Sequence, residues 1–343
     1  MPGARVAHVT SSGQAMPCAT FEQALAGQRE SGGYVWIDLE DPARADLDAL
    51  AGPFGLHPLA IEDCLDGDEV PKIEDFPQNT FVIFNRFHFS DHELAVEEVD
   101  FFLGTSFLIT VAAHPLDSGA RQRLDDAIRA KQANVGKGPD HLLHVILDHV
   151  VDDQLLAIEA LQDDLDQAEE LALARGSSGF DPTQLLRLRR NLLASRKSLF
   201  HGREILIKIC RKDSPFISEA AVYQFRDVYD HLVKFLEVIE MCREMVATLM
   251  ELHLSLVNNE LARLGNRTNQ IVRRLTLITT VFMPLSFFAG VGGMSEWSMM
   301  TGPENWKIAY PLFLLGMSVV GVASYYLFKW LERRPARRVR GRS

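Results

Sequence analysis

The chain reads LTLITTVFMPLSFFAGVGGM over residues 275–294, twenty positions without a charged side chain. A second stretch of this kind, IAYPLFLLGMSVVGVASYYLF, covers residues 308–328. A helix rises about 1.5 Å per residue, so each stretch spans about 30 Å, the thickness of the hydrocarbon core of a bilayer. Buried core helices of a soluble protein are the alternative, but such helices rarely run so long without a charge. The sequence therefore predicts two transmembrane helices, 275–294 and 308–328.

The charges that flank these two stretches indicate an orientation. Basic residues precede the first stretch and follow the second, whereas the connector 295–307 carries acids and only Lys307, at its edge. Cytoplasmic flanks of membrane helices are enriched in lysine and arginine. We therefore expect both termini in the cytoplasm, 295–307 as an extracytoplasmic loop, and 329–343 as a basic cytoplasmic tail near anionic lipid. The basic residues are Arg263, Arg267, Arg273 and Arg274 on one side, and Lys329, Arg333, Arg334, Arg337, Arg338, Arg340 and Arg342 on the other.

The rest of the chain has the composition of a cytoplasmic domain. The formal net charge of the whole chain is −11, despite the basic tail. The N-terminal segment lacks the apolar run of a signal peptide, so we expect this part to stay in the cytoplasm beneath a bacterial-type inner membrane. The cysteines lie far apart, without the spacing of a zinc site, which indicates reduced thiols. They are Cys18, Cys64, Cys210 and Cys242.

The stretch before the first predicted span has the pattern of one very long helix. Residues 216–283 contain no proline and a single glycine, Gly265. At about 1.5 Å per residue, a helix over this range is about 100 Å long. Apolar residues continue along it at spacings of three and four, as in a helix that packs along one face. We therefore expect a stalk helix that becomes the first transmembrane span and bundles with copies from other subunits.

The N-terminal part, residues 1–140, alternates strand-like and helical patterns. Four segments rich in valine, isoleucine and aromatic residues predict strands, and the short Gly104-Thr105 spacer between the last two is typical of a hairpin. Beyond it, residues 141–274 are expected to hold a helical region and the long stalk. The predicted strands are 34–39, 80–89, 96–104 and 106–113.

An acidic face runs along the first helix predicted in that region. Carboxylates on it could bind regulatory divalent cations between subunits, because hard ions prefer oxygen ligands. A solvated face without a ligand is the other interpretation, and it is favoured for any single residue. The acids are Asp148, Asp152, Asp153, Asp163, Asp164, Asp166, Glu169 and Glu170.

One stripe of the first span combines small and hydroxyl-bearing side chains. Its positions recur at about 100° per residue, so they would face a common axis if subunits pack around one. Such a stripe can line a narrow pore for a hydrated ion, with hydroxyls contacting water and apolar rings acting as gates. It can equally mediate close packing of helices, as small residues often do in membranes. The stripe consists of Asn269, Val272, Thr276, Thr279, Met283, Ser286 and Gly290.

Several motifs occur together and in a fixed order along the chain. They are WIDLEDP (36–42), FGLHPLAIEDCL (54–65), PKIEDF (71–76), EVDFFLG…FLITV (98–111) and TVFMPLSFFAGVGGMSEW (280–297). This combination resembles the CorA-type superfamily of metal-ion transporters and is similar to its zinc-transporting ZntB branch. The resemblance implies a homopentamer with an α+β cytoplasmic funnel domain, a long stalk helix and a two-helix transmembrane region. It also implies transport of Mg²⁺, Co²⁺, Ni²⁺ or Zn²⁺ through a pore lined by the first span.

The residues after the first span depart from that family's signature. Gly293-Met294-Ser295 stands where the family has Gly-Met-Asn, so the resemblance implies that Ser295 holds the hydrated ion through water. A serine hydroxyl is shorter than an asparagine amide and offers fewer donors, so it should hold the ion more weakly. Glu296 and Glu304 could form an acidic ring that concentrates cations at the mouth, or they could be solvated loop charges.

The sequence contains no motif that points to catalysis. A nucleophile elbow, a phosphate-binding loop and a dinucleotide-binding fingerprint are all absent from it, so we expect neither an enzyme nor a cofactor. We expect a divalent cation, Mg²⁺ or Zn²⁺, as the transported substrate. The expected partners are the lipid bilayer and further copies of the chain, without nucleic acid. A non-conducting membrane scaffold or regulator, which kept the fold and lost the signature asparagine, is the alternative function.

Overall fold

The computed structural model describes residues 4–67, 69–175, 181–294, 299, 302 and 304–333. The chain divides into an N-terminal unit, Met1–Leu254, and a C-terminal unit, Ser255–Ser343. Helix α8 (Glu219–Gly292) contributes residues to both units. The finer division expected from the sequence, with boundaries after residues 140, 274, 294, 307 and 328, stays a prediction.

The N-terminal unit is built on one mixed sheet of seven strands, in the order β2-β1-β3-β7-β6-β5-β4. Neighbouring strands run antiparallel except β3 and β7, which are parallel. This parallel pair joins the first three strands to the last four, so one sheet runs through the unit. The strands are β1 (Ala4–Val9), β2 (Ala15–Cys18), β3 (Tyr34–Glu40), β4 (Lys72–Asp75), β5 (Thr80–Ser90), β6 (Glu93–Leu103) and β7 (Phe107–Ala112).

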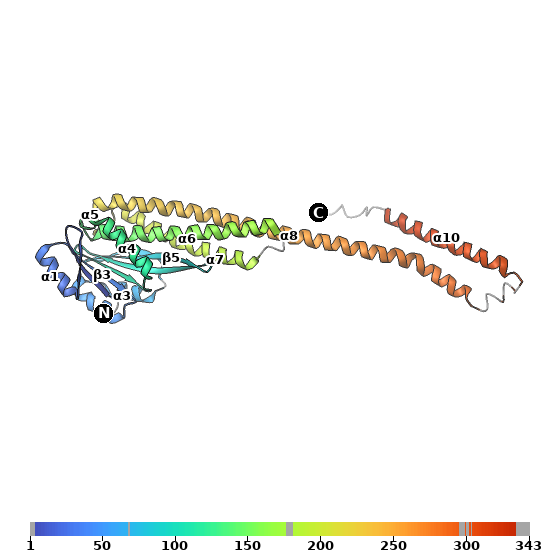
Figure 1. Cartoon of the computed structure of the whole chain (residues 1–343), viewed down its shortest axis with the longest axis horizontal. Coiled ribbons are helices and arrows are strands. Elements are labelled where there is room, and N and C mark those ends of the chain that lie inside the picture. The colour runs from blue at the N-terminus through green and yellow to red at the C-terminus, as the bar shows by residue number, and fades with distance from the viewer. Residues whose placement is uncertain are drawn as a thin grey trace. The chain divides into compact units, whose positions relative to one another are not determined.

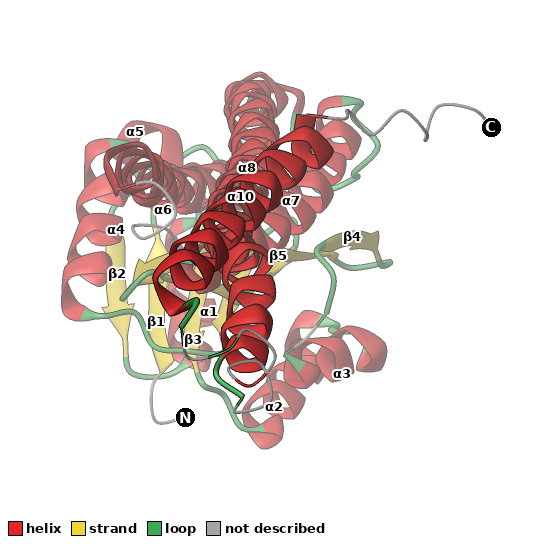
Figure 2. Ribbon diagram, turned by 90° about the vertical axis from the view of Figure 1, so that its right-hand side faces the viewer, coloured by secondary structure: helices red, strands yellow, loops and turns green. Residues whose placement is uncertain are grey.

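Helices cover both faces of this sheet, which forms a three-layer arrangement with two hydrophobic cores. One core packs the sheet against α1, α2 and α3, and the other packs it against α4, α6, α7 and α8. Figure 2 shows α2 and α3 on one side of the strands and α6 on the opposite side. The helices of this unit before α8 are α1 (Phe21–Ser31), α2 (Arg44–Phe54), α3 (Pro58–Asp66), α4 (Ser118–Ala130), α5 (Gln132–Val135), α6 (Pro139–Arg175) and α7 (Pro182–Cys210).

Helix α8 is a single helix of 74 residues. Its first part buries apolar side chains at spacings of three and four, among them Val222, Phe225 and Val228, against the core that α6 and α7 share. Figure 1 shows this part running beside α6 and α7. The helix continues through Pro284 to Gly292. The predicted stalk helix that becomes the first apolar span is therefore confirmed.

The C-terminal unit contains the end of α8 and helix α10 (Trp306–Arg333). Within the part of the chain that the structure describes, these are the two helices long and apolar enough to cross a membrane. The apolar window of each is 0% buried within the chain. Apolar surface of this extent needs lipid or other subunits around it. The predicted span 308–328 lies inside α10, and the predicted span 275–294 lies inside α8 except for its last two residues, since α8 ends at Gly292.

The four strands predicted from the sequence are confirmed as β3, β5, β6 and β7, with ends shifted by at most three residues. The predicted hairpin is the β6–β7 pair, closed where the Gly104 N–H donates to the Phe107 carbonyl oxygen at 2.9 Å. Strands β1, β2 and β4 were not predicted. They lie at the two ends of the sheet, and β2 is short and includes Pro17, so the β-branched and aromatic pattern that marks buried strands is weak there.

Candidate functional site

The predicted stripe of α8 is exposed at all seven of its positions in the single chain. Val272 is 54% exposed and Met283 is 72% exposed. A Cβ atom added at Gly290 would meet no atom within 4 Å. The stripe therefore offers its whole length to a pore or to another subunit, and its role as pore lining stays a prediction at this point.

The opposite face of the same part of α8 packs on α10. A Cβ added at Gly292 would lie 2.6 Å from the Phe313 ring, and one added at Gly321 would lie 3.6 Å from Leu285. At about 100° per residue, the centre of the half-buried face lies about 150° from the centre of the exposed stripe. Helix α10 thus covers the side of α8 that points away from the stripe. The half-buried positions are Leu277, Thr280, Val281, Pro284, Leu285 and Gly292.

Two threonines of the stripe donate their hydroxyl protons to their own helix. Thr276 Oγ1 donates to the Val272 carbonyl oxygen at 2.8 Å, and Thr279 Oγ1 donates to the Leu275 carbonyl oxygen at 2.9 Å. A hydroxyl used in this way keeps oxygen lone pairs that accept hydrogen bonds from water. The water shell of a cation directs its hydrogen atoms outward, so these oxygens suit a hydrated cation.

The signature residues lie at the C-terminal end of α8. The amide groups of Gly293 and Met294 donate to α8 carbonyl oxygens at 3.0 and 3.2 Å, so both residues continue its last turn. Ser295 and Glu296, predicted to hold the ion and to form an acidic ring, lie outside the described residues. Glu304 is described and exposed, and it lies just before α10. Its place in an acidic ring stays a prediction.

A second constellation, in the N-terminal unit, joins Asp148 of the predicted acidic face to two residues of α8 that were not predicted. Asp148 of α6 and Asp227 and His231 of α8 each offer one ligand atom, and these atoms lie within 4.8 Å of one another. Asp148 also forms an ion pair with Lys131. Two carboxylates and one imidazole can bind a divalent cation. The sequence did offer a signal, because Asp227 and His231 are four residues apart and therefore share one face of a helix.

The acidic face on α6 is partly buried. Asp164 is 5% exposed, and its carboxylate lies 2.7 Å from His92 Nδ1 in the turn between β5 and β6. Asp153 pairs with Arg123 at 3.3 Å. The solvated interpretation is therefore wrong for Asp164, because the β5–β6 hairpin covers that position and supplies its partner.

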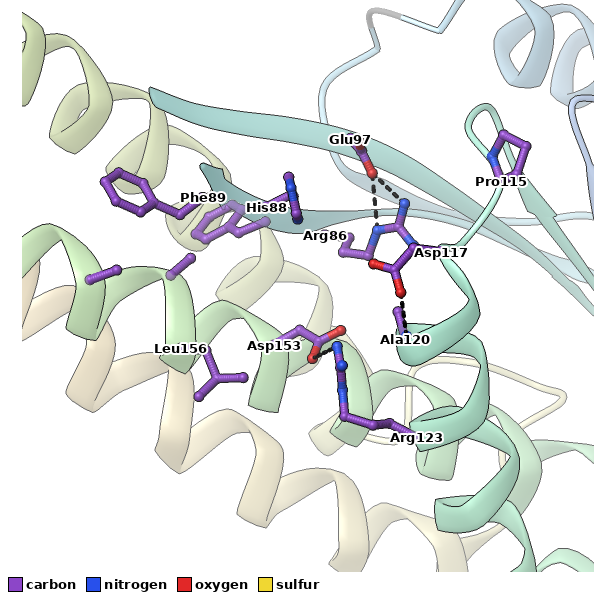
Figure 3. A pocket seen from close by; sticks show the side chains of 13 residues that line it. Arg86, His88, Phe89, Glu97, Pro115, Asp117, Ala120, Arg123, Asp153 and Leu156 are labelled. Carbon is purple, nitrogen blue, oxygen red and sulfur yellow. Dashed lines mark hydrogen bonds and ion pairs between the residues drawn. The ribbon is translucent and has the colours of Figure 1, made fainter. Parts of the chain in front are cut away.

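A pocket of about 310 Å³ lies between β5, β6, α4 and α6. Figure 3 shows that its charged side chains are paired within it, Arg86 with Glu97 and Arg123 with Asp153. The Asp117 side chain caps the first turn of α4. Because these charges neutralise one another, they stabilise the packing of the four elements. We therefore place the candidate site on α8 and at the Asp148 cluster, and not in this pocket.

One protein-family model matches almost the whole chain. It is the model described as "CorA-like Mg2+ transporter protein", and it matches residues 31–333. The matched range includes the sheet, the long helix α8 and both apolar helices.

Two curated proteins are similar over most of their length. The cobalt/magnesium transport protein CorA of Thermotoga maritima is 34% identical over 88% of this chain and 85% of that protein. The putative metal ion transporter YfjQ of Bacillus subtilis is 30% identical over 86% of this chain and 89% of that protein. The complete structure of the CorA magnesium transporter from Methanocaldococcus jannaschii matches with a TM-score of 0.67 at 23% identity, over 97% of this chain and 98% of that chain. At this identity the structural match shows the fold.

Proposed function

We propose, from the premise that this chain belongs to the family of CorA-like Mg²⁺ transporter proteins, that it carries divalent metal cations across a membrane through a pore on the axis of a homopentamer. The observation that carries the proposal is the exposed stripe of α8 on the side away from α10. When five copies place this stripe on one axis, α8 lines the pore and α10 surrounds it.

The side chains of the stripe suggest how a hydrated cation passes. Thr276 and Thr279 present hydroxyl oxygens that accept hydrogen bonds from the ion's water shell. The five copies of Val272, and likewise of Met283, form an apolar constriction around the axis. Such a constriction lets the ion pass only when it is filled with water and therefore acts as a gate. The stripe carries no charged side chain, so it holds the ion weakly at several levels, as conduction requires.

The direction of flux follows from the orientation that the flanking charges favour. With both termini in the cytoplasm of a bacterial-type cell, the loop 295–307 faces outward and receives the ion. A membrane potential that is negative inside contributes about 2.3 kcal/mol per elementary charge per 100 mV, and roughly twice that for a divalent cation. Glu296 and Glu304 raise the local concentration of cations at this mouth.

The uncharged, hydroxyl-bearing lining of the proposed pore favours ions that keep their water shell. Mg²⁺ loses its water shell reluctantly, so hydroxyl oxygens that contact the shell and not the ion suit it. Hydrated Zn²⁺ can use the same path, because it needs histidine or cysteine ligands only after it sheds water. The side chain of Ser295 is shorter than that of asparagine and offers fewer hydrogen-bond donors. We therefore propose a filter that discriminates weakly between Mg²⁺ and Zn²⁺.

Ion uptake by the purified protein in liposomes tests this function. We expect uptake of Mg²⁺ into liposomes that contain an indicator dye. In Ser295→Asn, the ratio of Mg²⁺ to Zn²⁺ uptake should rise about 3- to 10-fold, the effect of one additional hydrogen bond of roughly 1 kcal/mol to the water shell, which Mg²⁺ keeps more firmly than Zn²⁺ does. Ser298→Asn, in the same loop, is the matched control and should keep the wild-type ratio.

The same measurement separates transport from the alternative of a non-conducting scaffold or regulator, which the loss of the signature asparagine motivates. An inserted, oligomeric protein that takes up none of Mg²⁺, Co²⁺, Ni²⁺ and Zn²⁺ would contradict transport. If Ser295→Asn changes neither rate nor selectivity while the wild type conducts, Ser295 is not part of the filter.

We further propose that Asp148, Asp227 and His231 bind a divalent cation in the N-terminal unit, apart from the transport path. The three ligand atoms are already close enough to share one ion. Lys131, which pairs with Asp148, places an ammonium group there when no metal ion is bound. A cation at this position therefore competes with a lysine, so its affinity should be moderate and should respond to cation concentration.

Asp227→Asn should raise the Mg²⁺ concentration that protects the full-length protein from trypsin by about 10-fold or more, because one of two carboxylate ligands is lost. Asp230→Asn is the matched control, since Asp230 is exposed on the same helix and lies outside the cluster. Protection is measured as the fraction of intact chain across a Mg²⁺ titration. Equal shifts in the two variants would argue for a nonspecific charge effect.

A further inference from the structure

Two carboxylates are buried next to each other on β6. Asp100 is 3% exposed and Glu98 is 7% exposed. Residues two apart on a strand point to the same side of the sheet, and here that side is covered by α3, whose Cys64 lies against Asp100. The carboxyl groups of Glu98 and Asp100 lie within hydrogen-bonding reach of each other.

The surroundings of this pair supply few hydrogen-bond donors. In the described part of the chain, Asp100 Oδ1 and Glu98 Oε1 are buried without a hydrogen-bond partner. The other oxygen of Glu98, Oε2, accepts from the Glu69 backbone N–H at 3.2 Å. Within the sheet, Asp100 lies between Ile83 of β5 and Val111 of β7, and both neighbours are apolar and buried.

The charged groups on the α3 and β4 side of the pair do not neutralise it. α3 contributes the Cys64 thiol, which donates a hydrogen bond to Asp100, and the Asp63 carboxylate, whose negative charge acts on Asp100. β4 contributes Lys72, whose ammonium group lies 2.8 Å from Asp63 and 3.8 Å from each of two glutamates on the surface. Lys72 is therefore paired with other acids, and the surroundings of Glu98 and Asp100 keep an excess of carboxylates.

The polar and charged groups of β5 and α7 near Glu98 do not neutralise it either. β5 places Asn85 opposite Glu98 in the sheet, but the Asn85 amide donates to Ser198 at 3.0 Å. Lys197 of α7 lines a pocket of about 230 Å³ together with Glu98 and Glu69. Among the ion pairs of the described residues, none joins Lys197 to Glu98.

We propose that Glu98 and Asp100 bind one proton between them at neutral pH, as a hydrogen-bonded pair of one carboxyl group and one carboxylate. Two adjacent ionised carboxylates in this setting would repel each other and would both lose their hydration. A shared proton removes one charge and creates a donor between two oxygens that otherwise only accept. The shared proton therefore explains why Asp100 Oδ1 and Glu98 Oε1 have no other hydrogen-bond partner.

The pKa shifts have the direction that a shared proton requires. Burial, and then the charge of Glu98, raises the pKa of Asp100 well above its usual range. Burial raises the pKa of Glu98 from 4.5 to about 6. An acid with a raised pKa in the folded state stabilises the fold below its unfolded pKa and loses that contribution as the pH rises through the folded value. The pair should therefore make the N-terminal unit less stable as the pH rises from 4.5 through about 6.

Asp100→Asn tests the proposal on the full-length protein, because an amide at this position keeps the shape and can donate to Glu98 as the protonated acid does. Infrared spectra of the wild type at neutral pH should contain the C=O stretching band of a buried protonated carboxyl group, and the variant should lack it. The urea midpoint, measured by pulse proteolysis, should fall for the wild type between about pH 5 and pH 8, and at most half as much for the variant.

Glu22→Gln removes an exposed carboxylate of α1 and serves as the matched control. We expect this variant to keep both the infrared band and the pH dependence of the urea midpoint that the wild type has. A wild type without the band, or an Asp100→Asn variant that retains both the band and the wild-type pH dependence, would overturn the proposal. A Zn²⁺ or Co²⁺ ion bound in stoichiometric amount and lost in Cys64→Ser would also overturn it, since a metal ion would then neutralise the pair.

Discussion

Thr279→Phe should reduce divalent cation uptake at least about 100-fold, because in the proposed homopentameric pore five phenyl rings at one level would exclude water and leave no path for a hydrated ion. Thr279 lies on the exposed stripe of α8, and its hydroxyl contacts the carbonyl oxygens of its own helix. The substitution replaces an oxygen that can accept from the ion's water shell with an apolar ring. Uptake into dye-loaded liposomes measures the loss, and the oligomer is checked by size-exclusion chromatography.

Ile278→Phe is the matched control for this experiment. Ile278 is 51% exposed and lies one position earlier, about 100° around the same helix. We expect its uptake to stay within about threefold of the wild type, because a larger apolar side chain on this face meets lipid or a neighbouring helix. Loss of uptake in Ile278→Phe alone would place a different face of α8 on the axis.

Phe225→Ala should cause the largest loss of stability of any single truncation that we propose. Phe225 is 0% exposed in the core that α8 shares with α6 and α7, and its ring lies edge-on to that of His144 on α6 at 5.3 Å. Truncation of a large buried aromatic side chain costs about 3–5 kcal/mol, through lost transfer free energy and the cavity left behind. The urea midpoint of the N-terminal unit, measured by pulse proteolysis of the full-length protein, reports this loss.

Tyr223→Ala, two residues earlier on α8, is the control for helix propensity and for the loss of an aromatic ring. Tyr223 is 70% exposed, so its truncation should change the free energy of unfolding by about 0.5 kcal/mol or less. Similar losses in the two variants would contradict the packing of this face of α8 on the core.

The long helix and the apolar spans could be predicted because their signals extend over many residues. The apolar spacing along α8 and the absence of proline before Pro284 act over more than sixty positions, so single exceptions such as Gly265 do not obscure the pattern. Strands β3, β5, β6 and β7 carry a similarly strong local pattern of β-branched and aromatic residues.

The buried pair on β6 could not be predicted, for a reason that the sheet makes clear. Val99, Phe101 and Leu103 alternate with Glu98 and Asp100 along the strand, and such alternation is typical of a strand with one solvated face. Here α3 covers the second face. Only the tertiary arrangement shows that these two acids are buried.

The sequence predicted one part of the candidate site, the stripe of α8, and its role as pore lining stays a prediction. The stripe of α8 was found from helical spacing, and the structure places its residues on an open face. The cluster of Asp148, Asp227 and His231 was missed because its members are far apart in sequence and meet only when α6 packs beside α8. In the proposed homopentamer a single chain contributes only one side of the axial pore, so side-chain spacing cannot give the width of that pore.

The continuity of α8 has a consequence for the order of events during synthesis. Among the described residues, the last one that packs on the core of the N-terminal unit is Leu252, 23 positions before the first apolar span begins at residue 275. Ribosomes add about 5–20 residues per second, so roughly 1–5 s separate the completion of that core from the start of the span. The N-terminal unit can therefore fold before the insertion machinery receives its first apolar segment.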